Sequence, residues 1–227
     1  MLAITFLVNK IRRMLKLLIK YKFSIIGIAI NELNSIILNF FLKHKIERIY
    51  GKFETGIYFT HQFNNVSNES GHIKGEIVWI IRKLNIENAI VLLVGETNKV
   101  KTNFLENFPF RSLNTTGISD NVDYHWDFND QIPVGIGKYN LILSQAVLEH
   151  LVDPVDHIRK LKLLLADNGY LIVHTVMPGF FYHRYPVDCL RFYPDWFQEI
   201  SKLVKLQIKF KILSLDHIIY CYQHSNL

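Results

Sequence analysis

The hydrophobic residues of the chain are spaced in two alternating ways, one typical of strands and the other of helices. Continuous apolar runs that end at glycine, proline or polar residues indicate strands buried on both faces. Clear runs occupy residues 89–96, 139–145 and 169–176, and weaker ones occupy residues 108–119 and 122–128. Two further runs, at residues 206–216 and 217–223, follow each other so closely that they predict a hairpin.

Between these runs the apolar residues recur at intervals of three and four, which predicts amphipathic helices. The predicted helices occupy residues 76–85, 153–167 and 194–204. Asn168-Gly169 is a typical stop signal for the second helix, and Pro194 suits the start of the third. Strands that alternate with helices imply a mostly parallel sheet covered on both faces. We therefore predict an α/β, Rossmann-like, doubly wound fold with a seven-stranded sheet and a C-terminal antiparallel hairpin.

The first 52 residues differ from the rest of the chain in their charge. They hold ten lysines and arginines but only two glutamates, so the net charge of +6 is concentrated there. Apolar residues recur with helical spacing among these basic residues, which predicts a basic amphipathic helical extension at residues 1–52. Such a helix either packs on its own domain or lies on an anionic membrane surface, through residues 1–48. Its apolar runs are shorter than the roughly 20 residues that span a bilayer.

The remaining composition limits the class of protein. Residues 53–75 are polar and form a connecting segment, and residues 76–227 form the main domain. Cys189 and Cys221 suit neither a disulfide framework nor a metal site, so a cytoplasmic protein is expected, peripheral to the inner face of the membrane if the extension binds there. The histidines lack close ligand spacing and no basic segment carries stacking aromatics, so we expect neither a metal site nor a nucleic-acid partner. The oligomeric state is not predicted.

The segment from Tyr139 to Pro178 resembles the second half of class I S-adenosylmethionine-dependent methyltransferases of the type 11-like group. That group has a strand, a "vLEHv.dP" segment, a helix and a glycine before the next strand. The matching residues here are Val147, Leu148, Glu149, His150, Asp153, Pro154 and Gly169. A later pattern of one subgroup, "H..P.D..RF.p", is matched by His183, Pro186, Asp188, Arg191, Phe192 and Pro194. That subgroup often serves sugar, polysaccharide or cell-envelope biosynthesis. The resemblance therefore implies S-adenosylmethionine as the cofactor and a glycan or other small molecule as the methyl acceptor.

The resemblance also implies where the cofactor binds. In open α/β sheets, ligands bind at the carboxyl ends of the strands. Asp127 and Phe128 suit the adenine, as an acceptor beside an apolar ring, although Asp127 could equally cap a local turn. Ser144 and Gln145 follow a strand at the position near the sulfonium and the amino-acid tail, although they could equally be a plain strand end.

On the substrate side, the resemblance points to a loop after the last parallel strand. His183 is the candidate base that removes a proton from a hydroxyl acceptor. Asp188 and Arg191 are candidate substrate-binding residues, because a guanidinium can hold an anionic group. The alternative is that this pair fixes the loop to the sheet. The adjacent Glu149 and His150 are interpreted as a helix start near the cofactor, because adjacent helical residues do not face one another.

The first turn departs from the family pattern. The family's first strand ends in an acid and is followed by a glycine-rich turn, whereas this chain has Leu93 at the acidic position and keeps only Gly95. At the end of the second strand Gly117 stands where an acid is usual, and Asp120 follows three residues later. Two hypotheses follow. In one, the protein is an active methyltransferase in which Glu96 or Asp120 takes over polar contacts to the cofactor. In the other, it is a degenerate domain that keeps the fold, binds the cofactor weakly or not at all, and serves as a partner-binding or regulatory subunit. A nicotinamide-dependent dehydrogenase is less favoured, because it would need a fuller glycine-rich turn.

Overall fold

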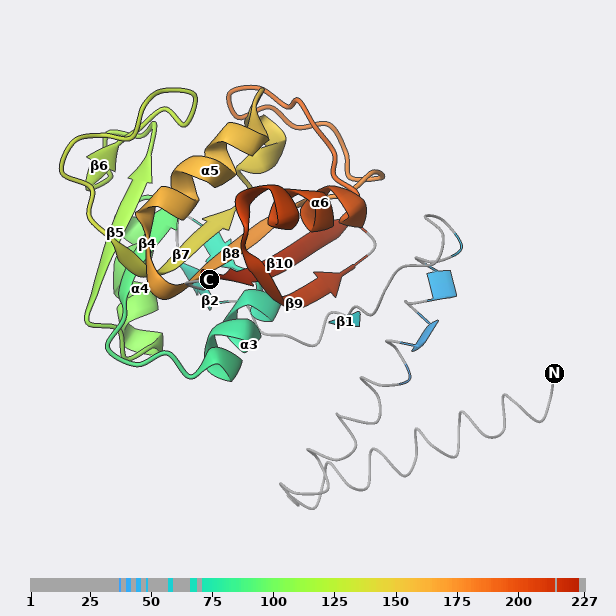
Figure 1. The fold of residues 1–227 in the computed structure, drawn as a ribbon, viewed down its shortest axis with the longest axis horizontal. Helices are drawn as coiled ribbons and strands as arrows, with labels where there is room; N and C mark the ends of the chain where they lie inside the picture. The colour runs from blue at the N-terminus through green and yellow to red at the C-terminus, as the bar shows by residue number, and fades with distance from the viewer. Residues whose placement is uncertain are drawn as a thin grey trace, which may run out of the picture.

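A computed structural model describes residues 71–214 and 216–224 without interruption (Figure 1). Before residue 71 it describes two short segments, 57–58 and 66–68, and the single helical positions Ile37, Phe40, Phe41, His44, Lys45 and Arg48. The predicted basic extension and its membrane contact therefore lie almost entirely outside the described residues. In the part of the chain that is described, no helix is long and apolar enough to cross a membrane.

The described residues form a large mixed sheet (Figure 1). In spatial order its eight described strands are β1 (Ile57–Tyr58), β9 (Gln207–Leu213), β10 (His217–Gln223), β8 (Leu165–Val176), β7 (Tyr139–Gln145), β4 (Ile90–Val94), β5 (Ser112–Gly117) and β6 (Tyr124–His125). Strands β6, β5, β4, β7 and β8 run parallel, whereas β10 pairs antiparallel with both β8 and β9. The predicted seven-stranded sheet with a closing hairpin is confirmed, and β1 is a short addition parallel to β9.

Helices cover both faces of this sheet, which explains why its central strands are apolar throughout. The described helices are α3 (Gly75–Leu84), α4 (Lys99–Asn107), α5 (Pro154–Leu164) and α6 (Pro194–Val204). In β4, Leu92 belongs to the hydrophobic cluster under α5 and α6, and Leu93 belongs to the cluster over α3 and α4. Consecutive strand residues point to opposite faces, so each face receives alternate residues of the same run. A separate two-stranded ribbon pairs β2 (Val66–Asn68) with β3 (Gly71–Ile73).

Two of the described helices differ from the sequence prediction. The helix predicted at residues 153–167 ends at Leu164, and β8 begins at the next residue, where Leu165 pairs with Tyr139. The expected stop signal is instead a bend within β8. Asn168 has φ of 59°, and a Cβ on Gly169 would lie 2.9 Å from the carbonyl oxygen of Ala166. Helix α4 was not predicted, because it is short and polar and its contact with the core rests largely on Val100 and Phe104.

Candidate functional site

A cavity of about 320 Å³ opens at the carboxyl ends of β4, β5 and β7. Its walls come from the turns that follow these strands, from the loop after β6, and from residues 185–187. Strand β4 lies between β5 and β7, so the chain order reverses here, and this switch point is where open α/β sheets bind ligands.

At the floor of the cavity, Gly95 lies close to both Gly117 and Val147. Gly95 has φ of +83°, and a Cβ placed on it would lie 2.6 Å from Cγ2 of Val147. A Cβ on Gly117 would lie 3.7 Å from the Cα of Gly95. The N–H of Gly95 donates to the carbonyl oxygen of Thr116, at 2.8 Å. Glycine at position 95 therefore leaves bare backbone facing the cavity, even though Thr97 and Lys99 stand where the family has further glycines.

The Glu96 carboxyl lines the cavity beside this turn. Burial raises the pKa of Glu96 from 4.5 to about 7. Its Oε1 accepts a hydrogen bond from Nε2 of Gln145 at 3.5 Å, and Oε1 of Gln145 accepts from the backbone N–H of Lys74 at 3.1 Å. No lysine, arginine or histidine among the described residues forms an ion pair with Glu96. Such a carboxyl is suited to a cationic group that enters the cavity.

Asp127 and Phe128 also line the cavity. Phe128 is 9% exposed and packs edge-on against Trp126, with ring centroids 5.1 Å apart. Oδ1 of Asp127 accepts hydrogen bonds from the backbone N–H of Asn129 at 3.0 Å and from its side-chain Nδ2 at 2.9 Å. Asp127 thus caps the local turn, but only through its Oδ1 atom. The other carboxylate oxygen, Oδ2, has no hydrogen bond to a described residue.

Three other predicted cofactor residues do not form the walls of the cavity. Asp120 is exposed, and its neighbours Ile118 and Ser119 line the cavity instead. Ser144 is fully buried within β7, with no hydrogen-bond partner for Oγ in the described part of the chain. Gln145 does not line the cavity, but its side chain donates a hydrogen bond to Glu96, which does.

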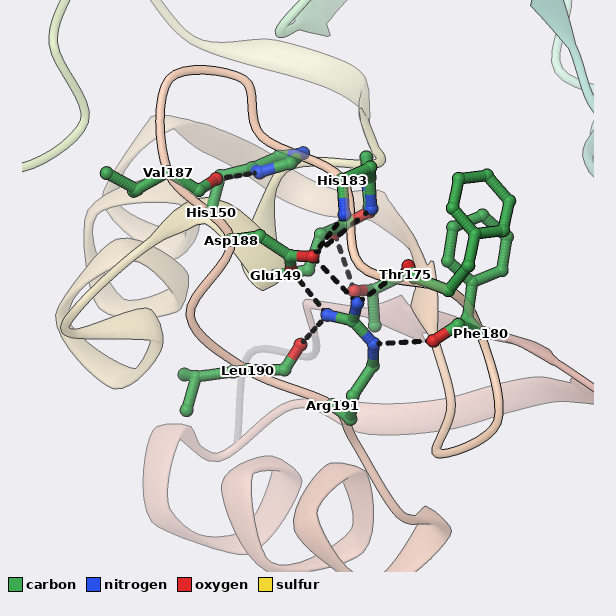
Figure 2. Close-up of polar contacts among 10 residues, drawn as sticks. Glu149, His150, Thr175, Phe180, His183, Val187, Asp188, Leu190 and Arg191 are labelled. Atoms are coloured by element: carbon green, nitrogen blue, oxygen red, sulfur yellow. Dashed lines mark hydrogen bonds and ion pairs between the residues drawn. The ribbon is translucent and has the colours of Figure 1, made fainter.

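Asp188 and Arg191 fix the loop between β8 and α6 (Figure 2). The carboxylate of Asp188 pairs with both terminal nitrogens of Arg191 and accepts the backbone N–H of His183 at 2.7 Å. The guanidinium also donates to the backbone oxygens of Phe180, Phe181 and Leu190. These contacts use every N–H of the guanidinium. The hydrogen bond from Arg191 is the main reason why the pKa of Asp188 is far below its usual range. The geometry supports the alternative interpretation, a loop-fixing pair, over substrate binding.

The same loop brings His183 to Glu149 and His150, which belong to the short helix η1 (Leu148–His150) (Figure 2). Glu149 is fully buried, and its Oε2 accepts a hydrogen bond from the Thr175 hydroxyl at 2.6 Å. Burial raises the pKa of Glu149. The ring of His150 contacts the carbonyl oxygen of Val187 and lies edge-on to the His183 ring, with centroids 4.9 Å apart. His150 also lines the cavity.

Comparison with known proteins identifies the family to which the chain belongs. A family profile described as "methyltransferase domain" matches residues 87–223, more than half of the chain. The chain belongs to the methyltransferase domain family. No curated protein sequence matches it.

Solved methyltransferases share the fold of this methyltransferase domain. One is the 1,6-didemethyltoxoflavin-N1-methyltransferase of Burkholderia thailandensis, solved with bound 1,6-didemethyltoxoflavin and S-adenosylhomocysteine. It is 13% identical with a TM-score of 0.53, over 66% of this chain and 76% of that chain. Another is an S-adenosylmethionine-dependent methyltransferase from Clostridium acetobutylicum, 11% identical with a TM-score of 0.51, over 66% of this chain and 89% of that chain. The predicted class I methyltransferase fold is confirmed.

The methyltransferase cavity contains residues that sequence reasoning missed. Val147 meets Gly95 at the floor, Thr97 lines the wall, and Tyr185 and Val187 reach the cavity from the distant loop. The matched "vLEH" segment was the available signal for Val147. The sequence offered no comparable signal for residues 185–187, because no regular pattern there predicts the path of the loop.

Proposed function

We propose that the protein transfers the methyl group of S-adenosylmethionine to a hydroxyl oxygen of a small molecule, such as a sugar, that enters the cavity at the ends of β4, β5 and β7. The observation that carries the proposal is the pairing of bare backbone at Gly95 and Gly117 with two carboxyls, Glu96 and Asp127, on the walls of one cavity. The cofactor supplies a methyl group bound to a positively charged sulfur, which an oxygen nucleophile can attack.

The cavity residues match the chemistry of the cofactor part by part. Phe128 offers an apolar ring to the adenine, and the unused Oδ2 of Asp127 can accept the adenine amino group. Glu96 is the carboxyl suited to the cofactor's ammonium group, because a neighbouring cation favours its charged form. One protein of the same fold was solved with S-adenosylhomocysteine, the product that remains after methyl transfer. These features favour an active cofactor site over a degenerate one.

The acceptor side is the loop between β8 and α6. It places Tyr185 and Val187 on the cavity wall and His183, the predicted base, beside His150. Phe181, Tyr182 and Tyr185 are each about 70% exposed on this loop. Aromatic faces of this kind suit the apolar faces of sugar rings, which supports a glycan or sugar acceptor.

Calorimetry with S-adenosylmethionine tests the proposal. The wild-type chain should bind it, and Asp127→Ala should weaken binding by about ten-fold, which corresponds to roughly 1.4 kcal/mol for one lost hydrogen bond to the ligand. Asp127→Asn keeps an oxygen for the Asn129 N–H, so it separates loss of the ligand contact from loss of the turn.

Asp130→Ala is the matched control, because Asp130 is exposed in the same loop and does not line the cavity. Its affinity should equal that of the wild type. If millimolar S-adenosylmethionine produced neither heat nor a thermal shift, the proposal would be wrong and the degenerate, partner-binding alternative would take its place. If Asp127→Ala bound as tightly as wild type, Asp127 would be removed from the site.

A further inference from the structure

Three potential metal ligands meet beside the cavity: two are adjacent in sequence and the third comes from a distant loop. One ligand atom from each of Glu149, His150 and His183 lies within 4.8 Å of the other two. Oε1 of Glu149 is buried and has no hydrogen-bond partner within the described residues. We propose that these three side chains bind a divalent transition-metal ion.

The partners around the cluster leave a free lone pair on two of the three ligands. The Thr175 hydroxyl donates to Oε2 of Glu149, so Oε1 is left with a free lone pair. Nδ1 of His150 contacts the carbonyl oxygen of Val187. A carbonyl can only accept, so the proton of the neutral ring is on Nδ1 and the lone pair is on Nε2. An imidazole that donates its other N–H to a backbone carbonyl is the usual arrangement around a metal-binding histidine.

The third ligand is held by the loop-fixing pair (Figure 2). The backbone N–H of His183 donates to Oδ2 of Asp188, which Arg191 holds in turn. Nδ1 of His183 lies 3.4 Å from the same oxygen. The Asp188–Arg191 pair therefore fixes the position of His183 relative to η1.

The donor set matches a specific class of ion. Two imidazoles and one carboxylate are ligands that Zn²⁺ and neighbouring transition metals prefer, whereas Ca²⁺ and Mg²⁺ favour oxygen ligands alone. Three protein ligands leave a coordination position open, as in catalytic zinc sites. A cation also accounts for the buried Glu149. Its second oxygen has no partner within the described residues, and an unpaired buried polar atom is costly.

The ion would activate the acceptor hydroxyl as the nucleophile of the methyl transfer. This step rests on the proposed function. His150 lines the cavity, so the open coordination position is placed to take an acceptor hydroxyl. A Lewis acid lowers the pKa of a bound hydroxyl, whose proton passes to water. The oxygen lone pair then forms the new C–O bond, and the electrons of the breaking C–S bond stay on sulfur as a neutral thioether. In this scheme His183 is a ligand rather than the base.

Metal titration without any methyl donor tests the inference. The full chain, stripped with a chelator, should bind one Zn²⁺ or Co²⁺, and Co²⁺ should produce a visible absorption band of nitrogen and oxygen ligation. Glu149→Gln and His183→Ala should each weaken binding by about ten-fold or more. Thr175→Val removes only the hydroxyl that orients Glu149, and a similar weakening is expected for such an outer contact. His125→Gln, an exposed histidine on β6 outside the cluster, should bind like the wild type.

Thermal melts in chelator establish that each variant folds. If Glu149→Gln does not fold, His183→Ala decides, because His183 belongs to a loop and is only partly buried. Absence of binding by the folded wild type, or equal binding by wild type, His183→Ala and His125→Gln, would overturn the inference. The two proposals fail separately. Metal binding without S-adenosylmethionine binding contradicts the proposed function alone, and the reverse result contradicts the metal site alone.

Discussion

At the scale of single residues, the carboxyl of Glu96 is unusual because burial raises its pKa to about 7. In the unfolded chain the same group would ionise near its ordinary value of 4.5. Between these two pH values the native state therefore binds more protons than the unfolded state. The contribution of Glu96 to stability is fully present below the unfolded pKa and is lost as the pH rises through the native pKa.

The first prediction concerns this pH dependence. The free energy of unfolding should fall between about pH 4.5 and 7 in the wild type, and Glu96→Gln should flatten that fall. At pH 8 the variant should be more stable by about 1–3 kcal/mol, because it has no charge to bury. Urea unfolding at pH 5 and pH 8 measures both effects. An unchanged pH profile in the variant would show that Glu96 does not hold its proton.

At the scale of elements, the turn after β4 depends on a glycine for two separable reasons. Gly95 needs positive φ, and it has no room for a Cβ beside Val147. Gly135 has a similar φ of +91°, but a Cβ there would meet nothing within 4 Å. Comparing the two positions therefore separates backbone strain from collision.

The second prediction uses this pair. Gly135→Ala should cost about 1–2 kcal/mol through its left-handed backbone alone. Gly95→Ala should cost a further 1–3 kcal/mol, roughly the usual effect of overpacking, and should also weaken S-adenosylmethionine binding. Chemical unfolding and calorimetry on both variants measure these effects. Equal destabilisation at the two positions would mean that Val147 moves away from the added Cβ without loss of stability.

Most elements could be predicted because their burial follows a simple period. Strand β7 and helix α6 lie where the pattern predicts them, at Tyr139–Gln145 and Pro194–Val204. Helix α4 could not be predicted, because few of its residues are apolar. The predicted end of α5 was wrong because Asn168-Gly169 serves equally well as a helix stop and as a bend inside a strand.

The same contrast holds for the site. Gly95, Glu96, Asp127 and Phe128 directly follow strands, so the edge of the sheet predicts that they lie together. The meeting of His183 with Glu149 and His150 depends on hydrogen bonds from Arg191 to three backbone oxygens. Such contacts leave no periodic pattern in the sequence, so the sequence could not predict that these three side chains meet.

At the scale of the whole molecule, charge is divided unevenly along the chain. Residues 1–52 hold ten of its 26 lysines and arginines, whereas 18 of its 20 acids come later. This division does not depend on the conformation of the extension. A basic segment with apolar residues at helical spacing is attracted to anionic lipid, and salt screens that attraction.

The third prediction follows from this charge distribution. Liposomes that contain anionic lipid should retain the full chain better than a chain that lacks residues 1–48, because the basic residues are then missing. Sedimentation with the liposomes measures retention, neutral liposomes serve as the control, and added salt should reduce the difference. Equal retention of the two chains would refute a membrane role for the extension.

The way in which Arg191 fixes its loop has a consequence for how the enzyme can change over evolutionary time. Apart from Asp188, its hydrogen-bond acceptors within the described residues are all backbone carbonyls, which every amino acid provides. The exposed side chain of Tyr182 is therefore free to vary while the path of the loop is kept, whereas Phe181 packs against His183 and Tyr185 lines the cavity. Under the proposed function, new acceptor preferences can arise there by single substitutions, with the sheet and the path of the loop left untouched.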